Sequence, residues 1–286
     1  MGEIKGYFGH RASLKRLGSL AAAKGVNAIV ALLRGKLTAL LLGPEGMGVA
    51  ALLMSTATTI QNASGLGMNL SGVKAVASGA DHAALTLRRL FLGAALLAGV
   101  ATVILAPWLG EATFGNNDSV AAFRILSPGV FFASLAAGEF AILQGRRAMT
   151  RLARSSAIGA VVGLLPAVPL YLCYGLAGIA PSLVVASAVL WVSLRLAAGR
   201  SPQGSRFDRK LARQLVTTGM MMMSSLVAGA AVAWLTLVAI RSFSSVAEAG
   251  LYQSANATVA RATEMVFAAL SLDFFPALAM VARSTP

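Results

Sequence analysis

Candidate ligand-binding residues lie on one face of an apolar segment, residues 17–42. Lys24, Asn27 and Arg34 interrupt a run of Leu, Ala, Ile and Val in this segment. On a helix that turns by about 100° per residue, the three side chains fall within roughly a third of the circumference. Each charge at bilayer depth costs at least ~2.5 kcal/mol, so this stripe requires a watery cavity or an anionic ligand. We therefore predict that Lys24, Asn27 and Arg34 line a cavity that binds an anion.

A second polar stripe follows in the predicted span at residues 48–68. Hydroxyl and carboxamide side chains share one face of this span at helical spacing, and they are Ser55, Thr58, Thr59, Asn62 and Asn69. Such groups can hydrogen-bond to a polar ligand, and they equally join neighbouring helices inside membranes. We predict Thr59 and Asn62 as cavity residues, with interhelical hydrogen bonding as the open alternative.

Two acidic residues inside predicted spans are candidates for coupling substrate movement to a proton or another cation. Glu139 is predicted to be an unpaired acid within the membrane. Glu264 follows Arg261 at i,i+3 spacing, so the two can meet on one helix face. If Glu264 takes up a proton, Arg261 is released to contact the substrate. The structural alternatives are that Arg261 and Glu264 neutralise each other, and that Arg34 snorkels or pairs with Glu139.

The elements that must position these residues are apolar helices. Of the 286 residues, 57% are hydrophobic and only 12% are charged, and the mean hydropathy is +0.75. A soluble domain carries about 25% charged residues, so the composition predicts an all-α membrane protein with about eight transmembrane helices. The net charge of +14 fits basic cytoplasmic loops better than nucleic-acid binding, because no nucleic-acid motif accompanies it.

The sequence predicts no enzymatic activity. Cys173 is the single cysteine, so the chain has no intrachain disulfide and no cysteine metal site. The two histidines show neither a Ser-His-Asp order nor metal-ligand spacing. We therefore expect no catalytic residues, no bound metal and no cofactor.

The positions of Lys and Arg predict the topology and the domains. Basic residues gather before the first predicted span, after the second and fourth spans, and in residues 197–213. The positive-inside rule therefore places both termini in the cytoplasm. Residues 1–200 form a predicted six-helix lobe, and residues 201–286 form a basic linker with the first two helices of a second lobe. A weak internal repeat, in which Gly48 aligns with Gly250, supports two related lobes.

Several motifs along the chain resemble one family of membrane proteins. They are the GPEG turn at residues 43–46, the GLGMN element at 65–69, GLAGIAPSLV at 175–184, AEAGLYQSA at 247–255 and ARATEMVFAALSLDFFPALA at 260–279. Together they resemble the Wzx-type polysaccharide or O-antigen flippases of the multidrug/oligosaccharidyl-lipid/polysaccharide (MOP) superfamily. That family has twelve or more spans, so the chain is interpreted as C-terminally truncated.

The resemblance implies two six-helix lobes around a central cavity that opens alternately to either side. It implies that undecaprenyl-pyrophosphate-linked oligosaccharides move from the cytoplasmic to the periplasmic leaflet of the bacterial inner membrane, for polysaccharide or lipopolysaccharide biosynthesis. A proton or sodium gradient would drive the movement. The implied partners are the lipid-linked oligosaccharide, membrane lipids, a polysaccharide polymerase and glycosyltransferases.

Two alternatives to a flippase remain at this point. One is a cation-coupled multidrug-type antiporter of the same superfamily, which would centre on acidic residues inside the membrane. Cationic substrates would be repelled by Lys24 and Arg34, which disfavours this alternative. The other is an inactive truncated remnant, which the missing helices favour.

Overall fold

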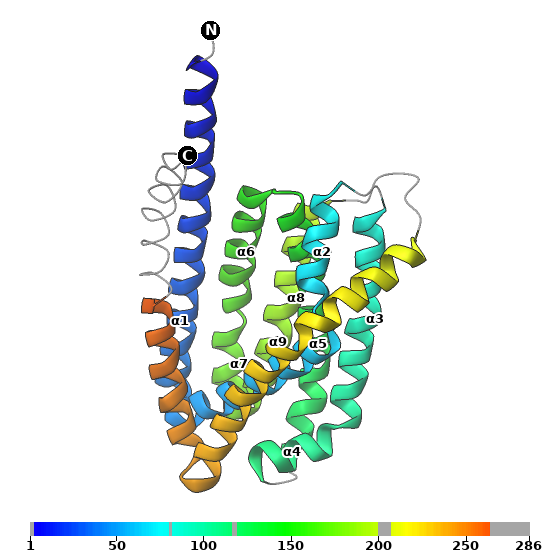
Figure 1. The fold of residues 1–286 in the computed structure, drawn as a ribbon. Helices are drawn as coiled ribbons and strands as arrows, with labels where there is room; N and C mark the ends of the chain where they lie inside the picture. Colours follow the sequence, from blue (N-terminus) through cyan, green and yellow to red (C-terminus); the bar gives the residue numbers. More distant parts are fainter. Residues whose placement is uncertain (1–2, 80–81, 116–118, 200–206, 264–286) are drawn as a thin grey trace, which may run out of the picture.

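The computed structural model describes residues 3–79, 82–115, 119–199 and 207–263, with side chains described from Gly25 onward except that of Met222 (Figure 1). All regular elements within these ranges are helices. Together with their apolar composition, this confirms the predicted all-α membrane protein. In chain order the helices are α1 (Glu3–Ser64), α2 (Met68–Ala77), α3 (Ala83–Ile104), α4 (Ala106–Phe114), α5 (Val120–Gly145), α6 (Met149–Leu164), α7 (Ala167–Tyr174), the short 3₁₀ helix η1 (Gly175–Gly178), α8 (Ile179–Ala198) and α9 (Arg209–Phe243). Residues 246–263 form a further helical segment.

The long helix α1 consists of two arms that meet at Gly43. This glycine has φ 68° and ψ −170°, a conformation that is open to glycine and strained for other residues. Pro44 then begins the second arm, where its missing N–H is tolerated. In Figure 1 the first arm descends from the N-terminus, and the second arm turns back toward α2. The predicted reversal at the GPEG motif is therefore present.

The long apolar helix α5 lies at the centre of the helices that precede the basic linker. It packs against α3 on one side and α8 on the other, and α6 in turn packs between α8 and the first arm of α1. Phe123, Leu126 and Val130 of α5 are buried in the largest apolar cluster, with residues of α1 and α8. Ser127 fixes α5 to α3, because its hydroxyl donates a 2.8 Å hydrogen bond to the carbonyl oxygen of Gly99.

Five helical stretches are long and apolar enough to cross a membrane: residues Gly25–Ser64, Ala83–Ile104, Val120–Gly145, Met149–Ala198 and Met223–Phe243. Two of these stretches double back. The first reverses at Gly43, and the fourth reverses between α6 and α8, which run antiparallel in Figure 1. The chain is therefore a multi-pass membrane protein. The predicted total of eight spans stays a prediction, because residues 264–286 lie outside the described part of the chain.

The helices after the basic linker pack against the bundle of helices before it. Helix α9 runs obliquely across it and contacts α1, α2, α3 and α4 (Figure 1). Residues 246–263 lie beside α1, where the backbones come so close that a Cβ atom on Gly48 would overlap the carbonyl oxygen of Val246. The predicted division into lobes at residue 200 stays a prediction.

Candidate functional site

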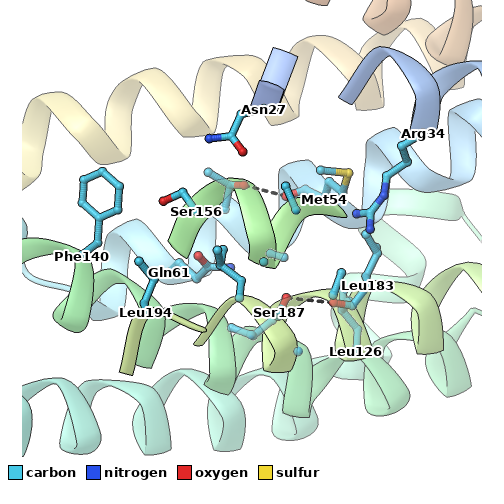
Figure 2. Close-up of a pocket in the computed structure, with 18 residues that line it drawn as sticks. Asn27, Arg34, Met54, Gln61, Leu126, Phe140, Ser156, Leu183, Ser187 and Leu194 are labelled. Atoms are coloured by element: carbon cyan, nitrogen blue, oxygen red, sulfur yellow. Dashed lines mark hydrogen bonds between the residues drawn. The ribbon is translucent and has the colours of Figure 1, made fainter. Parts of the chain in front are cut away.

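A cavity of about 450 Å³ opens between four helices that precede the basic linker. Its walls come from both arms of α1 and from α5, α6 and α8 (Figure 2). Most of the lining is apolar or small, and five neutral polar side chains and one cation also reach it: Asn27, Thr58, Gln61, Ser156, Ser187 and Arg34. We call this space the Arg34 cavity.

Arg34 supplies the only charge among the described residues that line the Arg34 cavity. Its Nη2 donates a 3.1 Å hydrogen bond to the carbonyl oxygen of Gly163. Gly163 lies in the last turn of α6, where backbone carbonyls lack intrahelical partners and cations are favoured. No carboxylate of the described chain forms an ion pair with Arg34. A neutral acceptor therefore positions the guanidinium, and its positive charge remains available to an anion.

The neutral polar groups of the cavity differ in what they can offer a ligand. Thr58 and Ser187 donate their hydroxyl protons to carbonyl oxygens of their own helices, each at 2.8 Å, so their oxygens face the cavity as acceptors. Asn27, Gln61 and Ser156 make no side-chain hydrogen bond to another residue that the structure describes. These three can both donate to and accept from a bound molecule.

The first predicted stripe is partly assembled in this cavity. Asn27 and Arg34 both line it, as their helical spacing predicted, and Figure 2 shows both reaching toward it from α1. Lys24 lies on the same arm, and its side chain is outside the described part of the structure.

The second predicted stripe divides between two environments. The Thr59 hydroxyl is 2.9 Å from the carbonyl oxygen of Ser55 and 3.3 Å from that of Ala230 in α9. Thr59 therefore joins helices instead of lining the Arg34 cavity, and Asn62 does not line it either. Their neighbours Thr58 and Gln61 do. The i,i+3,i+4,i+7 set of Met54, Ala57, Thr58 and Gln61 was the signal that could have identified this face.

Arg261, one of the two residues predicted across a central cavity, does not reach the Arg34 cavity. Arg261 is half-buried on the helical segment 246–263 and does not line it. Glu264 lies outside the described residues, so its predicted pairing with Arg261 stays a prediction. The described residues that line the Arg34 cavity all lie between Asn27 and Leu194, before the basic linker.

The prediction that Glu139 is unpaired is wrong. Its buried carboxylate accepts two hydrogen bonds from Arg88 of α3, at 2.8 Å from Nε and 2.9 Å from Nη2. The Nε atom of Arg195 in α8 lies 3.5 Å away. Arg88 precedes Glu139 by 51 positions, so the partner becomes visible only when α3 packs on α5. Because Glu139 is paired in this way, the alternative that Arg34 pairs with it is also wrong.

A comparison with protein families decides the identity of the chain. The sequence profile of a family described as polysaccharide biosynthesis protein matches residues 37–285. This chain belongs to that family. The family that the GPEG, GLGMN and related motifs predicted is thereby confirmed. No curated protein matches the chain significantly.

Solved structures show which fold this chain adopts. It is similar to the MATE multidrug transporter DinF-BH, solved in complex with R6G, with a TM-score of 0.70 and 15% identity over 85% of this chain and 60% of the transporter. It is also similar to an inward-facing multidrug resistance MATE family transporter of the MOP superfamily, with a TM-score of 0.63 and 17% identity over 80% of this chain and 57% of that one. The chain thus has a MATE-like fold and spans about 60% of the length of such transporters.

Proposed function

We propose that this protein moves lipid-linked oligosaccharides, such as undecaprenyl-pyrophosphate-linked repeat units, from the cytoplasmic to the periplasmic leaflet of a bacterial inner membrane. The observation that carries the proposal is the uncompensated charge of Arg34 in a cavity whose other polar groups are neutral. Membership of the polysaccharide biosynthesis family and the MATE-like fold support it.

The chemistry of the Arg34 cavity suits the polar part of such a substrate. A pyrophosphate and a glycan are both costly to transfer into hydrocarbon without compensating partners. The planar guanidinium of Arg34 can form two parallel hydrogen bonds to phosphate oxygens. Asn27, Gln61 and Ser156 can replace water around sugar hydroxyls. The lipid tail stays in the bilayer while the polar part passes along the cavity.

Alternating access and ion coupling are part of the proposal. A proton or sodium gradient would drive the cycle, with Glu139 and Glu264 as the candidate acids and Arg261 and Lys24 as further cations for the phosphate. In the proposed topology both termini are cytoplasmic. A polysaccharide polymerase and glycosyltransferases would act beside the protein.

An export experiment tests the role of Arg34. In bacteria that depend on this protein for surface polysaccharide, Arg34→Ala should reduce export by roughly tenfold or more, because a charge-assisted contact contributes about 1.5–3 kcal/mol. Arg34→Lys keeps the positive charge and loses the planar group that can form two parallel hydrogen bonds, so it should retain part of the export. Immunoblots of membranes serve as the control for protein level. Normal surface polysaccharide in Arg34→Ala cells would contradict the proposal.

The MATE-like fold favours one second candidate function, a cation-coupled drug antiporter. Arg34 would then repel a cationic ligand, so Arg34→Gln should strengthen the binding of an organic cation such as R6G. Fluorescence polarisation of R6G with the purified protein measures this. Tight R6G binding to the wild-type protein, together with unchanged polysaccharide export in Arg34→Ala cells, would favour the antiporter.

A further inference from the structure

A second cavity, of about 370 Å³, adjoins the Arg34 cavity. The two share four lining residues, Gln61, Phe140, Leu190 and Leu194, so they lie next to each other. In Figure 2, Phe140 and Arg34 stand at opposite ends of the Arg34 cavity. The second cavity therefore extends the space at the end remote from the cation.

The lining of this second cavity has a distinct chemistry. Its polar groups are three carboxamides, those of Gln61, Asn69 and Gln144, and no described residue that lines it carries a charge. None of the three carboxamides forms a hydrogen bond to another residue in the described part of the chain. We call this space the amide cavity.

The floor of the amide cavity is built from small residues beside one aromatic ring. Ala133, Ala136, Ala137 and Ala141 of α5 leave room above the helix. Phe140, on the same helix, is 42% exposed and is the only aromatic among the residues that line either cavity. An exposed aromatic face beside unpaired carboxamides can bind a molecule that is apolar on its ring faces and polar around its edge.

We propose that the amide cavity is a subsite for one neutral sugar residue of the glycan. The sugar ring stacks on Phe140, and its hydroxyls exchange hydrogen bonds with Gln61, Asn69 and Gln144. The phosphate attached to that glycan binds at Arg34 in the adjoining cavity. The volume suits this ligand, because small-molecule sites span roughly 300–1,000 Å³. This inference rests on the proposed function, whose substrate carries both groups.

Binding measurements on the purified 286-residue protein in lipid nanodiscs test the subsite. One probe is farnesyl pyrophosphate, and the others are farnesyl pyrophosphates that carry a single glucose, galactose, rhamnose or N-acetylglucosamine residue. The wild-type protein should bind at least one sugar-carrying probe more tightly than farnesyl pyrophosphate. Phe140→Leu should reduce that preference, the ratio of the two affinities, by roughly three- to tenfold, the range expected for an aromatic contact.

Two further variants separate the contacts. Gln144→Leu keeps the volume of the side chain and removes its hydrogen bonds, so it should lower the affinity for the preferred sugar-carrying probe alone by roughly two- to tenfold. Phe243→Leu is the matched control, since Phe243 lies at the end of α9 with 92% of its surface exposed and lines neither cavity. It should leave every affinity unchanged.

The outcomes distinguish the subsite from the proposed function. If the wild-type protein binds none of the probes, the proposed function fails. If the protein binds farnesyl pyrophosphate and no sugar-carrying probe binds more tightly, the subsite is overturned and the role of Arg34 stands. The same holds if Phe140→Leu leaves the higher affinity for the sugar-carrying probe intact. If Phe140→Leu weakens all probes equally, the amide cavity holds the prenyl chain and the sugar assignment is wrong.

Discussion

Arg34 retains an available charge because its partner in the structure is a backbone carbonyl and not a carboxylate. A carbonyl at the end of α6 positions the guanidinium without neutralising it. Glu139 shows the opposite arrangement, since Arg88 holds both of its oxygens and Arg195 approaches one of them. A buried acid with this partner stabilises the contact between α3 and α5 whether or not it also couples transport.

The Arg88–Glu139 pair predicts a specific pattern of stability. Glu139→Leu should lower the free energy of unfolding by up to roughly 3–5 kcal/mol, because it removes the buried carboxylate that accepts two hydrogen bonds from the part-buried guanidinium of Arg88. The double variant Arg88→Met/Glu139→Leu should lower the free energy of unfolding by less, since it removes the cation together with the carboxylate. Reversible unfolding in mixed detergent micelles measures both.

The matched control for this cycle is Glu248→Gln, which changes an exposed acid. It should leave the stability within about 0.5 kcal/mol of the wild-type value. A double variant that is less stable than Glu139→Leu would show that Arg88 acts independently of the ion pair, through its 2.7 Å hydrogen bond to the carbonyl oxygen of Gly199.

At the scale of elements, the first turns of α3 hold both ends of the segment that joins α8 to α9. Arg88 donates to the carbonyl oxygen of Gly199, where α8 ends. The Arg89 guanidinium lies 5.8 Å from the ring centre of Phe207, and the backbone N–H of Asp208 donates to Thr86 at 3.2 Å. Helix α9 therefore begins at a point that α3 determines.

Arg146 is a further cation at the end of α8. Its Nη1 donates a 2.7 Å hydrogen bond to the carbonyl oxygen of Ala198. Burial, and next the charge of Arg88, lower the pKa of Arg146, whereas the nearby Glu139 raises it. Cations are favoured at the C-terminal end of a helix, so Arg88 and Arg146 together stabilise the last turn of α8.

The start of α9 supplies a prediction about helix capping. The Asp208 carboxylate accepts hydrogen bonds from the backbone N–H groups of Lys210 and Leu211, at 2.8 and 3.1 Å. Asp208→Ala should lower the free energy of unfolding by roughly 0.5–2 kcal/mol and speed amide exchange at Lys210 and Leu211. Asp208→Asn keeps a hydrogen-bond acceptor, so it should change the free energy of unfolding and the amide exchange rates only slightly. Equal exchange rates in the Ala and Asn variants would show that the contact with Thr86, and not the cap, holds this turn.

At the scale of the whole molecule, the close approach of Gly48 to Val246 fixes how the helical segment 246–263 lies on α1. Gly48→Val places a branched side chain where the backbone carbonyl of Val246 stands, so the segment must move away. Hydrogen exchange with mass spectrometry should show faster exchange across residues 246–263 and unchanged protection in α3 and α5. Gly93→Val is the matched control, because a Cβ atom at Gly93 meets no other atom within 4 Å.

An unchanged exchange pattern in Gly48→Val would contradict this account. It would mean that the second arm of α1 shifts to accommodate the side chain while the segment 246–263 keeps its place. The arrangement matters for the proposed transport cycle, since alternating access requires the helices after the linker to move against the first lobe.

Much of this protein followed from the sequence alone. The excess of apolar residues required helices in a membrane, because only helices and closed barrels satisfy their backbone hydrogen bonds there. The GPEG motif determined a reversal, since glycine and proline at this point favour a turn over a continuous helix. Helical periodicity placed Asn27 and Arg34 on one face, and both line the same cavity.

The tertiary structure decided which neighbour covers each face. Periodicity relates residues within one helix, but it does not say which distant helix packs on a given stripe. The polar stripe of the second arm of α1 is divided, with Thr58 in the cavity and Thr59 against α9. Glu139 gained its partner from 51 positions away. Phe140 lies beside the carboxamides of the amide cavity because α5, α8 and the second arm of α1 meet there. Such contacts depend on the packing of elements far apart in the chain, which no local pattern encodes.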